Sequence, residues 1–407
     1  MKNIDRLAEY GQEHLLRFAD ELSAAEKEGL IEQINNVDFS LLDEWKLKTA
    51  QAEKDNGAIT PLGALEIDEI ERRREEFEQV GLKAIREGKV AALLLGGGMG
   101  TRLGFDGPKG TYNLGVTRDF YIFEAQINNM LDVCRKAGCY FPLYIMTSDR
   151  NDEETRRFLK EKNFFGFPEE KVRFFRQEMA LCCDFEGKVL LEDKANLALS
   201  PNGNGGWFKS LVKSGLDKEL CEMGVEWINI FSMDNVLQRI CDPAFIGATL
   251  ISGVNCGAKV VCKNAPGEKV GALCLKDNLP TIVEYYEMGD AQAAELDETG
   301  KLKYRFGVIL NYLFSVKRLY EILDGKMPLH IVKKKIAHVD ENGNTVKPET
   351  ENGYKFEYLA TDTVRDMLTC VPFEVVREKE FAPIKNKEGI DSVVSARELL
   401  KLNGVEV

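Results

Sequence analysis

The sequence has few of the residues on which many hydrolases and metalloenzymes rely. Only three histidines, His14, His330 and His338, occur in 407 residues, and none has a ligand-type partner nearby. The ten cysteines form no C-x-x-C pair or zinc spacing and lie mostly inside apolar stretches. These absences argue against a histidine-based triad or metal site. They favour reduced core thiols in a cytoplasmic protein.

Excess positive charge and long apolar runs are also missing. The net charge is −13, which excludes a general affinity for nucleic acid or an anionic membrane. No run approaches the roughly 20 apolar residues of a membrane span. The opening stretch MKNIDRLAEYGQEHLLRFADEL has no apolar core before a cleavage site, so we expect no signal peptide. We therefore expect small-molecule partners, not nucleic acid or membrane.

The most informative stretch is VAALLLGGGMGTRLGFDGPKGTY, residues 90–112. Its first six residues, Val90–Leu95, have the length and composition of a strand buried on both faces. Glycines follow, with Gly97 and Gly98 as the predicted substrate-binding pair, since glycine adopts positive φ without strain and holds no side chain against a ligand. A strand that ends in such a loop presents backbone N–H groups, which suits phosphate.

Two cations follow these glycines. Arg102 offers a planar fork of donors, and Lys109, which Pro108 precedes, offers a point charge. Together they predict a polyphosphate site, although a glycine turn that serves only packing remains open. The P-loop pattern fails because Lys109 is followed by glycine, and the dinucleotide pattern G-x-G-x-x-G fails from Gly96 and from Gly98.

The pattern L-x-x-G-G-x-G-T-R-L-G followed by P-K-G resembles the signature of the UDP-sugar pyrophosphorylases, and is most similar to their UDP-N-acetylhexosamine branch. These uridylyltransferases join UTP and a sugar 1-phosphate. The resemblance runs from about Gly11 to Ala396, with its motifs in the family's order. It implies a Rossmann-like, GT-A-like nucleotidyltransferase fold with a three-layer mixed sheet, Mg²⁺ as cofactor, and UTP and a sugar 1-phosphate as substrates.

Alternation of strands and helices independently favours a parallel, three-layer α/β sheet. We expect a helical region over residues 1–88, a catalytic domain over 89–378 and a short segment over 379–407, in place of the C-terminal β domain of longer relatives. The main strands are predicted at Val90–Leu95, Tyr140–Met146, Val172–Arg176 and Trp227–Met233. Shorter strands are predicted at Ala258–Val261, Val270–Leu275, Thr281–Tyr286 and Phe373–Arg377, and helices at Glu66–Gly88, Phe123–Ala137, Asp152–Lys162 and Ser395–Leu402.

The resemblance assigns further substrate-binding residues. PNGNGG, residues 201–206, matches a family loop that faces the uridine and sugar, so Gly203 and Asn204 would contact ligand. By its residues alone this loop is more typical of an ordinary surface turn. Gln177 matches a glutamine that reads the uracil edge, with one donor and one acceptor group. Glu284 matches a glutamate that accepts hydrogen bonds from sugar hydroxyls, the alternative being a solvent-facing acid of a strand.

Two more positions complete the predicted site. Asp234 follows the apolar strand WINIFSM, where a carboxylate is well placed for Mg²⁺, although a helix N-cap is the alternative. By resemblance it is the metal ligand. Lys385, in FAPIKN, matches a lysine that reaches the phosphate, the alternative being an exposed loop lysine. The resemblance therefore implies that Arg102, Lys109 and Lys385 are the catalytic cations.

The sugar-binding side departs from the family pattern. The family's N-x-G-N-I stretch reads R-F-G-V-I at residues 305–309, and Val308 replaces the asparagine expected to touch the sugar. Valine cannot hydrogen-bond a hydroxyl, and Met99 stands where the branch usually has glutamine. N-acetylglucosamine 1-phosphate is the predicted substrate. A glucose or galactose 1-phosphate enzyme, or a nucleotide-sugar-binding protein without turnover, is the alternative.

Overall fold

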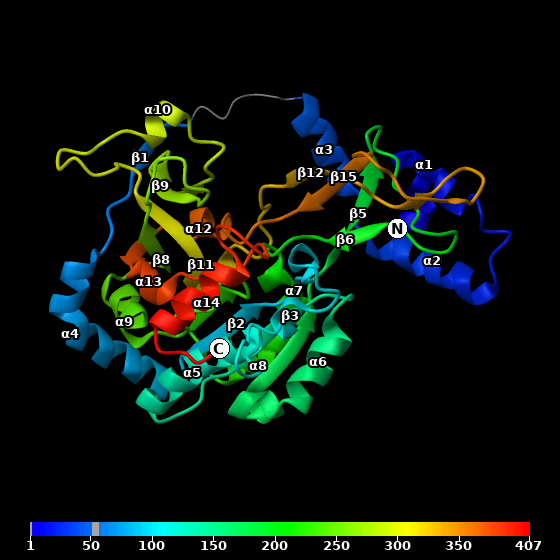
Figure 1. Ribbon diagram of the computed structural model, residues 1–407. Helices are drawn as coiled ribbons and strands as arrows, with labels where there is room; N and C mark the ends of the chain where they lie inside the picture. The colour runs from blue at the N-terminus through cyan, green and yellow to red at the C-terminus, as the bar shows by residue number, and fades with distance from the viewer. Residues whose placement is uncertain (1, 51–56) are drawn as a thin grey trace. The chain divides into compact units, whose positions relative to one another are not determined.

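The computed structural model describes residues 2–50 and 57–407, which fall into two compact units (Figure 1). Unit 1 combines residues from 1–56, 177–206 and 326–360, and unit 2 combines 57–176, 207–325 and 361–407. These units differ from the predicted boundaries at residues 88 and 378, because each is assembled from segments that are distant in the sequence.

Unit 2 contains a ten-stranded mixed sheet. Its strands are β1 (Ile59–Pro61), β2 (Val90–Leu95), β3 (Leu143–Thr147), β4 (Val172–Arg176), β7 (Trp227–Ser232), β8 (Cys256–Cys262), β9 (Ala272–Lys276), β10 (Leu279–Val283), β11 (Phe306–Ser315) and β16 (Cys370–Glu374). The main path is β1-β9-β11-β7-β2-β3-β4, with β10 beside β9, β8 beside β11 and β16 beside β8. Strands β7, β2, β3 and β4 are mutually parallel, whereas β11 runs antiparallel to β7 and β8.

Helices cover both faces of this sheet. They include α4 (Ile67–Arg86), α5 (Ile122–Ala137), α6 (Asp152–Glu161), α7 (Trp207–Lys213), α8 (Leu216–Glu222), α9 (Pro243–Ile251), α10 (Asp290–Ala293), α11 (Val316–Glu321), α12 (Thr363–Asp366), α13 (Arg377–Glu380) and α14 (Val393–Leu402). On one face, Val90 and Leu94 of β2 share a core with α4, α5, α9 and α14. On the other face, Trp207 of α7 stacks on Phe314 of β11 at 6.0 Å. The predicted three-layer arrangement is confirmed. The sheet is mixed, as the resemblance implies, and not wholly parallel, as the alternation of elements predicts, because β11 and its neighbours run antiparallel.

Helices α4 and α9 lie side by side in this unit (Figure 1). Their backbones approach so closely that a Cβ at Gly81 would lie 1.9 Å from the carbonyl oxygen of Pro243. Glycine is therefore required inside α4 in spite of its low helix propensity. This packing places residues 67–86 in unit 2 and not in a separate helical region.

The parallel strands define the edge of the sheet at which a ligand is expected. Their carboxyl ends all point to one side, where α/β proteins bind ligands. Loops leave this edge after Leu95, Thr147, Arg176 and Ser232, the last residues of β2, β3, β4 and β7. Because β11 is antiparallel to β7, its first residues lie at this same edge.

Unit 1 is a smaller sheet packed on N-terminal helices. Its strands are β5 (Met179–Asp184), β6 (Leu199–Pro201), β12 (His330–Lys334), β13 (His338–Val339), β14 (Thr345–Val346) and β15 (Gly353–Glu357), and its helices are α1 (Leu7–Tyr10), α2 (Ala24–Asn36) and α3 (Ser40–Ala50). The sheet order is β12-β15-β5-β6. Leu30, Ile34 and Trp45 of the helices share a core with Leu181 and Phe356 of the strands.

Most predicted elements of the sheet are confirmed, and β2 and β4 have the predicted bounds. Three predictions are wrong in part. Residues 59–61, within the stretch predicted to be helical, form β1, which pairs with β9; residues 51–56 of that stretch lie outside the described residues. Residues 377–380 form α13 and do not extend the last strand, and β10 ends before Glu284. None of the described helices has the length and apolarity needed to cross a bilayer.

Candidate functional site

The glycine loop after β2 keeps two of its N–H groups, those of Gly97 and Gly98, available. Ser148 Oγ donates to the carbonyl oxygen of Gly97 at 3.0 Å, and Asn151 Nδ2 donates to that of Gly96 at 2.9 Å and that of Gly98 at 3.3 Å. Within residues 2–50 and 57–407, the N–H groups of Gly97 and Gly98 donate to no acceptor. The carbonyls are thus bound by the protein, and the free N–H groups can receive an anion.

Sequence analysis missed Ser148 and Asn151. They lie in the turn between β3 and α6, and the N–H of Ser148 donates to Asn151 Oδ1 at 2.8 Å. Their position in the sequence could have indicated them. Polar residues that directly follow a parallel strand, here β3, lie at the edge of the sheet where β2 also ends. A single sequence does not reveal that their side chains reach the glycine loop.

Lys109 and Asp234, predicted in separate roles, form an ion pair with each other. Lys109 Nζ donates to Asp234 Oδ1 at 2.6 Å, with side chains that are 12% and 39% exposed. The N–H of Lys109 donates to the carbonyl oxygen of Gly98 at 3.1 Å, which ties the lysine to the glycine loop. Asp234 is not a helix N-cap, because α9 begins at Pro243 and is capped by Asp242.

Ile384, the residue before Lys385, ties the lysine's segment to Asp234. The N–H of Ile384 donates to the carbonyl oxygen of Asp234 at 2.9 Å. The Lys385 amine forms an ion pair with Asp391 Oδ2 at 3.0 Å and is 38% exposed. Sequence analysis did not single out Asp391. Phosphate bound by Lys385 would have to compete with this carboxylate.

Arg102 lies in a short 3₁₀ turn, Thr101–Leu103, directly after the glycine loop. Its side chain is exposed. No hydrogen bond or ion pair engages its guanidinium in the described part of the chain. The planar donor fork is therefore available to phosphate oxygens, in contrast to the two paired lysines.

Two sugar-side positions come together at Gly271. The N–H of Val308 donates to the carbonyl oxygen of Gly271 at 2.9 Å, and a Cβ at Gly271 would lie 3.3 Å from Glu284 Oε1. Arg305 has a structural role here: its guanidinium pairs with Glu66 and Asp297, each at 2.8 Å. Of the two departures within residues 305–309, only Val308 thus lies beside another predicted sugar residue.

The remaining predicted residues belong to unit 1. Gln177 directly follows β4 and is 8% exposed. In the loop at residues 201–206, the N–H of Ala360 donates to Asn204 Oδ1 at 2.9 Å. Gly203 has φ +85°, and a Cβ there would lie 2.3 Å from the carbonyl oxygen of Tyr358. This loop is therefore bound along the segment after β15.

The residues fit a magnesium ion only in part. The described residues contain no group of three or more His, Cys, Asp or Glu side chains arranged around a metal position. The half-exposed Asp234 offers one carboxylate, and its Oδ1 is hydrogen-bonded to Lys109. Magnesium is often held by one or two carboxylates and substrate phosphates. The donor set suits that kind of site and not one built wholly from protein ligands.

Buried polar side chains hold the loop that carries Asp234. Gln126 of α5 is 0% exposed, and its Nε2 donates to the carbonyl oxygen of Asn235 at 2.7 Å. Gln238 Nε2 donates to the carbonyl oxygen of Ser232 at 2.7 Å, and Asn229 Oδ1 accepts from the N–H of Cys241 at 2.6 Å. An irregular buried loop needs such partners because its main-chain groups have no strand or helix to bind.

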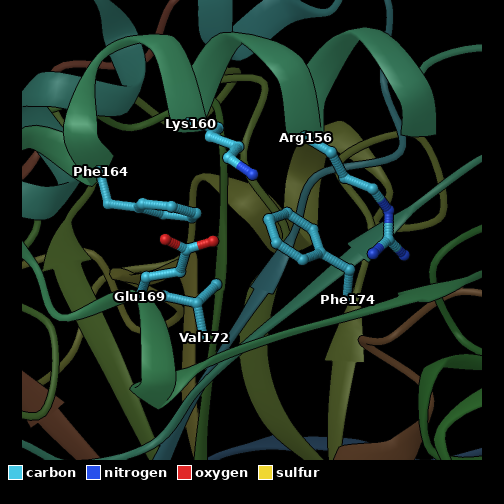
Figure 2. Close-up of a pocket in the computed structure, with 6 residues that line it drawn as sticks. All are labelled: Arg156, Lys160, Phe164, Glu169, Val172 and Phe174. Carbon is cyan, nitrogen blue, oxygen red and sulfur yellow. The ribbon is translucent and has the colours of Figure 1, made fainter.

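A separate surface pocket of about 320 Å³ lies between α6 and β4 (Figure 2). It is lined by Arg156, Lys160, Phe164, Glu169, Val172 and Phe174. Figure 2 shows the rings of Phe164 and Phe174 on opposite sides of the hollow, with the Glu169 carboxylate and the Lys160 amine between them. None of the predicted site residues lines this pocket.

Comparison with known proteins identifies the family. The family described as UTP–glucose-1-phosphate uridylyltransferase matches residues 39–404. UDP-N-acetylhexosamine pyrophosphorylase-like protein 1 of Xenopus tropicalis is 35% identical over 95% of this chain and 80% of its own length. UDP-N-acetylglucosamine pyrophosphorylase of Saccharomyces cerevisiae is 34% identical over 94% of this chain and 85% of its own.

A solved structure gives the same result. The uridine diphosphate N-acetylglucosamine pyrophosphorylase of Trypanosoma brucei, crystallised with an inhibitor, aligns with a TM-score of 0.82 and 28% identity, over 98% of this chain and 83% of its own. The match extends across both compact units. The chain belongs to the UDP-sugar pyrophosphorylase family of uridylyltransferases.

Proposed function

We propose that this protein transfers a uridylyl group from UTP to N-acetylglucosamine 1-phosphate, with UDP-N-acetylglucosamine and pyrophosphate as products. The observation that carries the proposal is the group of Lys109, Asp234 and the glycine loop at the carboxyl ends of β2 and β7. The relatives named for N-acetylglucosamine and N-acetylhexosamine support this choice of sugar.

In this proposal, the free N–H groups of Gly97 and Gly98 bind the triphosphate together with Arg102 and Lys109. Phosphate oxygens would replace the Asp234 carboxylate at the Lys109 amine, one charged acceptor for another. Lys385 would leave Asp391 in the same way to neutralise the sugar phosphate. Gln177, Gly203 and Asn204 would bind the uridine part, and Glu284 the sugar hydroxyls.

The reaction needs no protein nucleophile. A phosphate oxygen of the sugar 1-phosphate attacks the α-phosphorus of UTP. A new P–O bond forms as the bond from the α-phosphorus to the bridging oxygen breaks, and that electron pair leaves with pyrophosphate. The protein acts by positioning the two anions and neutralising their charge. Arg102 and Lys109 would stabilise the leaving pyrophosphate, and the scarcity of histidine agrees with a step that needs no proton transfer by a side chain.

Mg²⁺ is the proposed cofactor, with Asp234 as its protein ligand. When bound, the ion would supply positive charge to the phosphates. Asp234 would be available to hold the ion when the Lys109 amine binds phosphate. Asp234→Asn should reduce Mn²⁺ binding by the protein–UTP complex, measured by electron paramagnetic resonance, about tenfold. Unchanged binding would show that Asp234 is not the ligand.

The test of the function is pyrophosphate release from UTP and Mg²⁺ with a panel of sugar 1-phosphates: N-acetylglucosamine, N-acetylgalactosamine, glucose and galactose. We expect the highest kcat/KM with N-acetylglucosamine 1-phosphate. Preference for glucose or galactose 1-phosphate would favour the second candidate function, a uridylyltransferase for one of those sugars. The contact of Val308 with Gly271, beside Glu284, supports this candidate. Binding of UTP without release for any sugar would favour a nucleotide-sugar-binding protein.

A cytoplasmic location is proposed as well. None of the ten cysteines, all of which lie within the described residues, forms a disulfide, and most are buried or half-buried. Burial raises the pKa of the Cys134 and Cys274 thiols to about 12, so they are unreactive core residues. This supports a reducing compartment.

A further inference from the structure

A buried lysine joins two segments of unit 2 that are distant in the sequence. Lys259 of β8 is 0% exposed. Its amine donates to Asp242 Oδ2 at 3.0 Å, to Glu380 Oε2 at 2.6 Å and to the carbonyl oxygen of Arg239 at 3.0 Å. An ammonium group has three protons to donate, so this lysine is fully hydrogen-bonded. Two of its acceptors lie in the loop after β7, and the third ends α13.

The connection continues from Glu380 to the site. The carbonyl oxygen of Glu380 accepts from Asn235 Nδ2 at 2.7 Å, and Asn235 Oδ1 accepts from the N–H of Ala382 at 2.9 Å. Asn235 directly follows Asp234, and Ala382 lies three residues before Lys385. The buried cluster therefore fixes the segment that carries one predicted site residue against the loop that carries the other.

Stability alone does not explain this cluster. Burial of charges has a large desolvation cost, and replacement of buried ion pairs by apolar residues is often neutral or stabilising. Burial raises the pKa of the Glu380 carboxyl above its ordinary value even beside Lys259. What the charges provide is a specific geometry, since the observed arrangement of the two segments satisfies all of these hydrogen bonds and a shift of either segment would break them.

We propose that Lys259 and Glu380 are positioning residues for the uridylyl transfer, because they fix the Lys385 segment relative to the Asp234 loop. The inference rests on the proposed function, in which Lys385 neutralises the sugar phosphate. Lys259 is too deeply buried to touch a substrate, so it acts through Glu380 and the residues that follow. Nothing in the sequence pattern around Lys259 indicates this role.

Glu380→Gln tests the inference, since it keeps the size of the side chain and removes its charge. We expect faster hydrogen–deuterium exchange of the Ala382 and Ile384 amides. We also expect kcat to fall about tenfold with the KM for UTP within about twofold. The matched control is Glu219→Gln, which removes a carboxylate paired with Arg173 at 2.6 Å elsewhere in unit 2. The control should leave these exchange rates and kcat unchanged.

A double-mutant cycle separates positioning from general damage. In a Lys385→Ala background, Glu380→Gln should lower kcat by less than about twofold further, because residues that act through one another are not additive. A full tenfold further loss would overturn the inference, since it would mean that Glu380 affects turnover independently of Lys385.

Asn235→Ala serves as a second variant if Glu380→Gln does not fold. It breaks the same connection without leaving a buried charge, and the same exchange and kcat changes are expected. If the wild type releases pyrophosphate but the folded variants keep wild-type exchange and kcat, the positioning role is wrong and the proposed function stands. If the wild type releases no pyrophosphate with any sugar 1-phosphate, the proposed function itself is wrong. The positioning role of Lys259 and Glu380 in that reaction is then wrong as well.

Discussion

Two glycine-rich loops look alike in the sequence but have different surroundings. A Cβ at Gly98, in the loop after β2, would find no heavy atom within 4 Å. In the loop at residues 201–206, a Cβ at Gly203 would lie 2.3 Å from the carbonyl oxygen of Tyr358, and one at Gly205 would lie 2.6 Å from the nitrogen of Leu359. The absence of a Cβ at Gly98 leaves open space, whereas its absence at Gly203 and Gly205 allows close contact with the main chain of residues 358–359.

The two loops are also held differently. In the first, the Ser148 and Asn151 side chains bind carbonyls and leave N–H groups free. In the second, main-chain bonds predominate: the N–H of Gly205 donates to the carbonyl oxygen of Tyr358 at 2.8 Å. A glycine pattern thus predicts a close approach to the backbone, but it does not say whether a ligand or the protein itself makes that approach.

The largest effect is expected at Lys109, whose N–H is bonded to Gly98. Lys109→Ala should lower kcat by about 10²- to 10³-fold, as expected for loss of a group that stabilises charge in the transition state. The melting temperature should stay near that of the wild type. Lys160→Ala, which removes a lysine from the pocket of Figure 2, is the matched control and should keep kcat. Near-normal turnover of Lys109→Ala would show that the first loop is not part of the catalytic site.

The comparison of the two loops is tested directly by alanine at Gly98 and at Gly205. Gly205→Ala should reduce the free energy of unfolding by about 1–3 kcal/mol, because the added methyl overlaps main-chain atoms. Gly98→Ala should leave thermal stability unchanged and raise the KM for UTP about tenfold, since the methyl enters the space proposed for phosphate. Equal destabilisation by the two substitutions would contradict the conclusion that Gly98 faces open space and Gly205 faces main-chain atoms. An unchanged KM for UTP in Gly98→Ala would contradict the proposal that this space holds phosphate.

A smaller effect is expected from the support of the first loop. Asn151→Ala removes the donor of the Gly96 and Gly98 carbonyls, and a lost hydrogen bond of this kind should raise the KM for UTP by about three- to tenfold. Asn403→Ala is a suitable control, because Asn403 Nδ2 also donates to two carbonyl oxygens, at 2.7 and 2.8 Å, at the end of α14. A KM equal to that of the wild type would mean that the loop keeps its shape without Asn151.

The smallest effect concerns unit 1, which contains the second loop. Burial lowers the pKa of His14 below its ordinary value of 6.5, although its Nε2 is hydrogen-bonded to the carbonyl oxygen of Val189 at 2.8 Å. The unfolded chain therefore binds a proton more readily than the folded one. This contribution to stability is complete above pH 6.5 and is lost as the pH falls toward the lower pKa of the folded state. His14→Gln should flatten the dependence of the melting temperature on pH below 6.5; an unchanged slope would contradict this.

The sequence predicted the elements whose patterns are local and strong. The continuous apolar run of β2, the glycine loop and the strands that alternate with helices all follow from neighbouring residues. The family resemblance then identified the residues that could bind phosphate and metal. It did not reveal that Lys109 and Asp234 pair with each other, because that pairing is set by how loops from two different strands meet. It also did not reveal that Lys385 pairs with Asp391, although these residues lie only six positions apart, because the path of the loop between them decides the contact.

Unit 1 shows the limit of local prediction most clearly. Its sheet joins β5 with β15, which come from opposite halves of the chain. The stability of such short strands depends on distant partners, which neighbouring residues do not reveal. Neither β5 nor β15 was predicted from the sequence.

By itself, the sequence determined a glycine-rich loop after a buried strand, the cations Arg102 and Lys109 that follow it, and the α/β class, because glycine permissiveness, fixed charge and apolar periodicity are properties of neighbouring residues. The tertiary structure alone decided which glycine lies in open space, which carboxylate each lysine meets and why Lys259 can be buried. The pairing of Lys109 with Asp234 and the burial of Lys259 beside Glu380 depend on contacts between segments more than a hundred residues apart, and a buried charge is stable only where such contacts satisfy it.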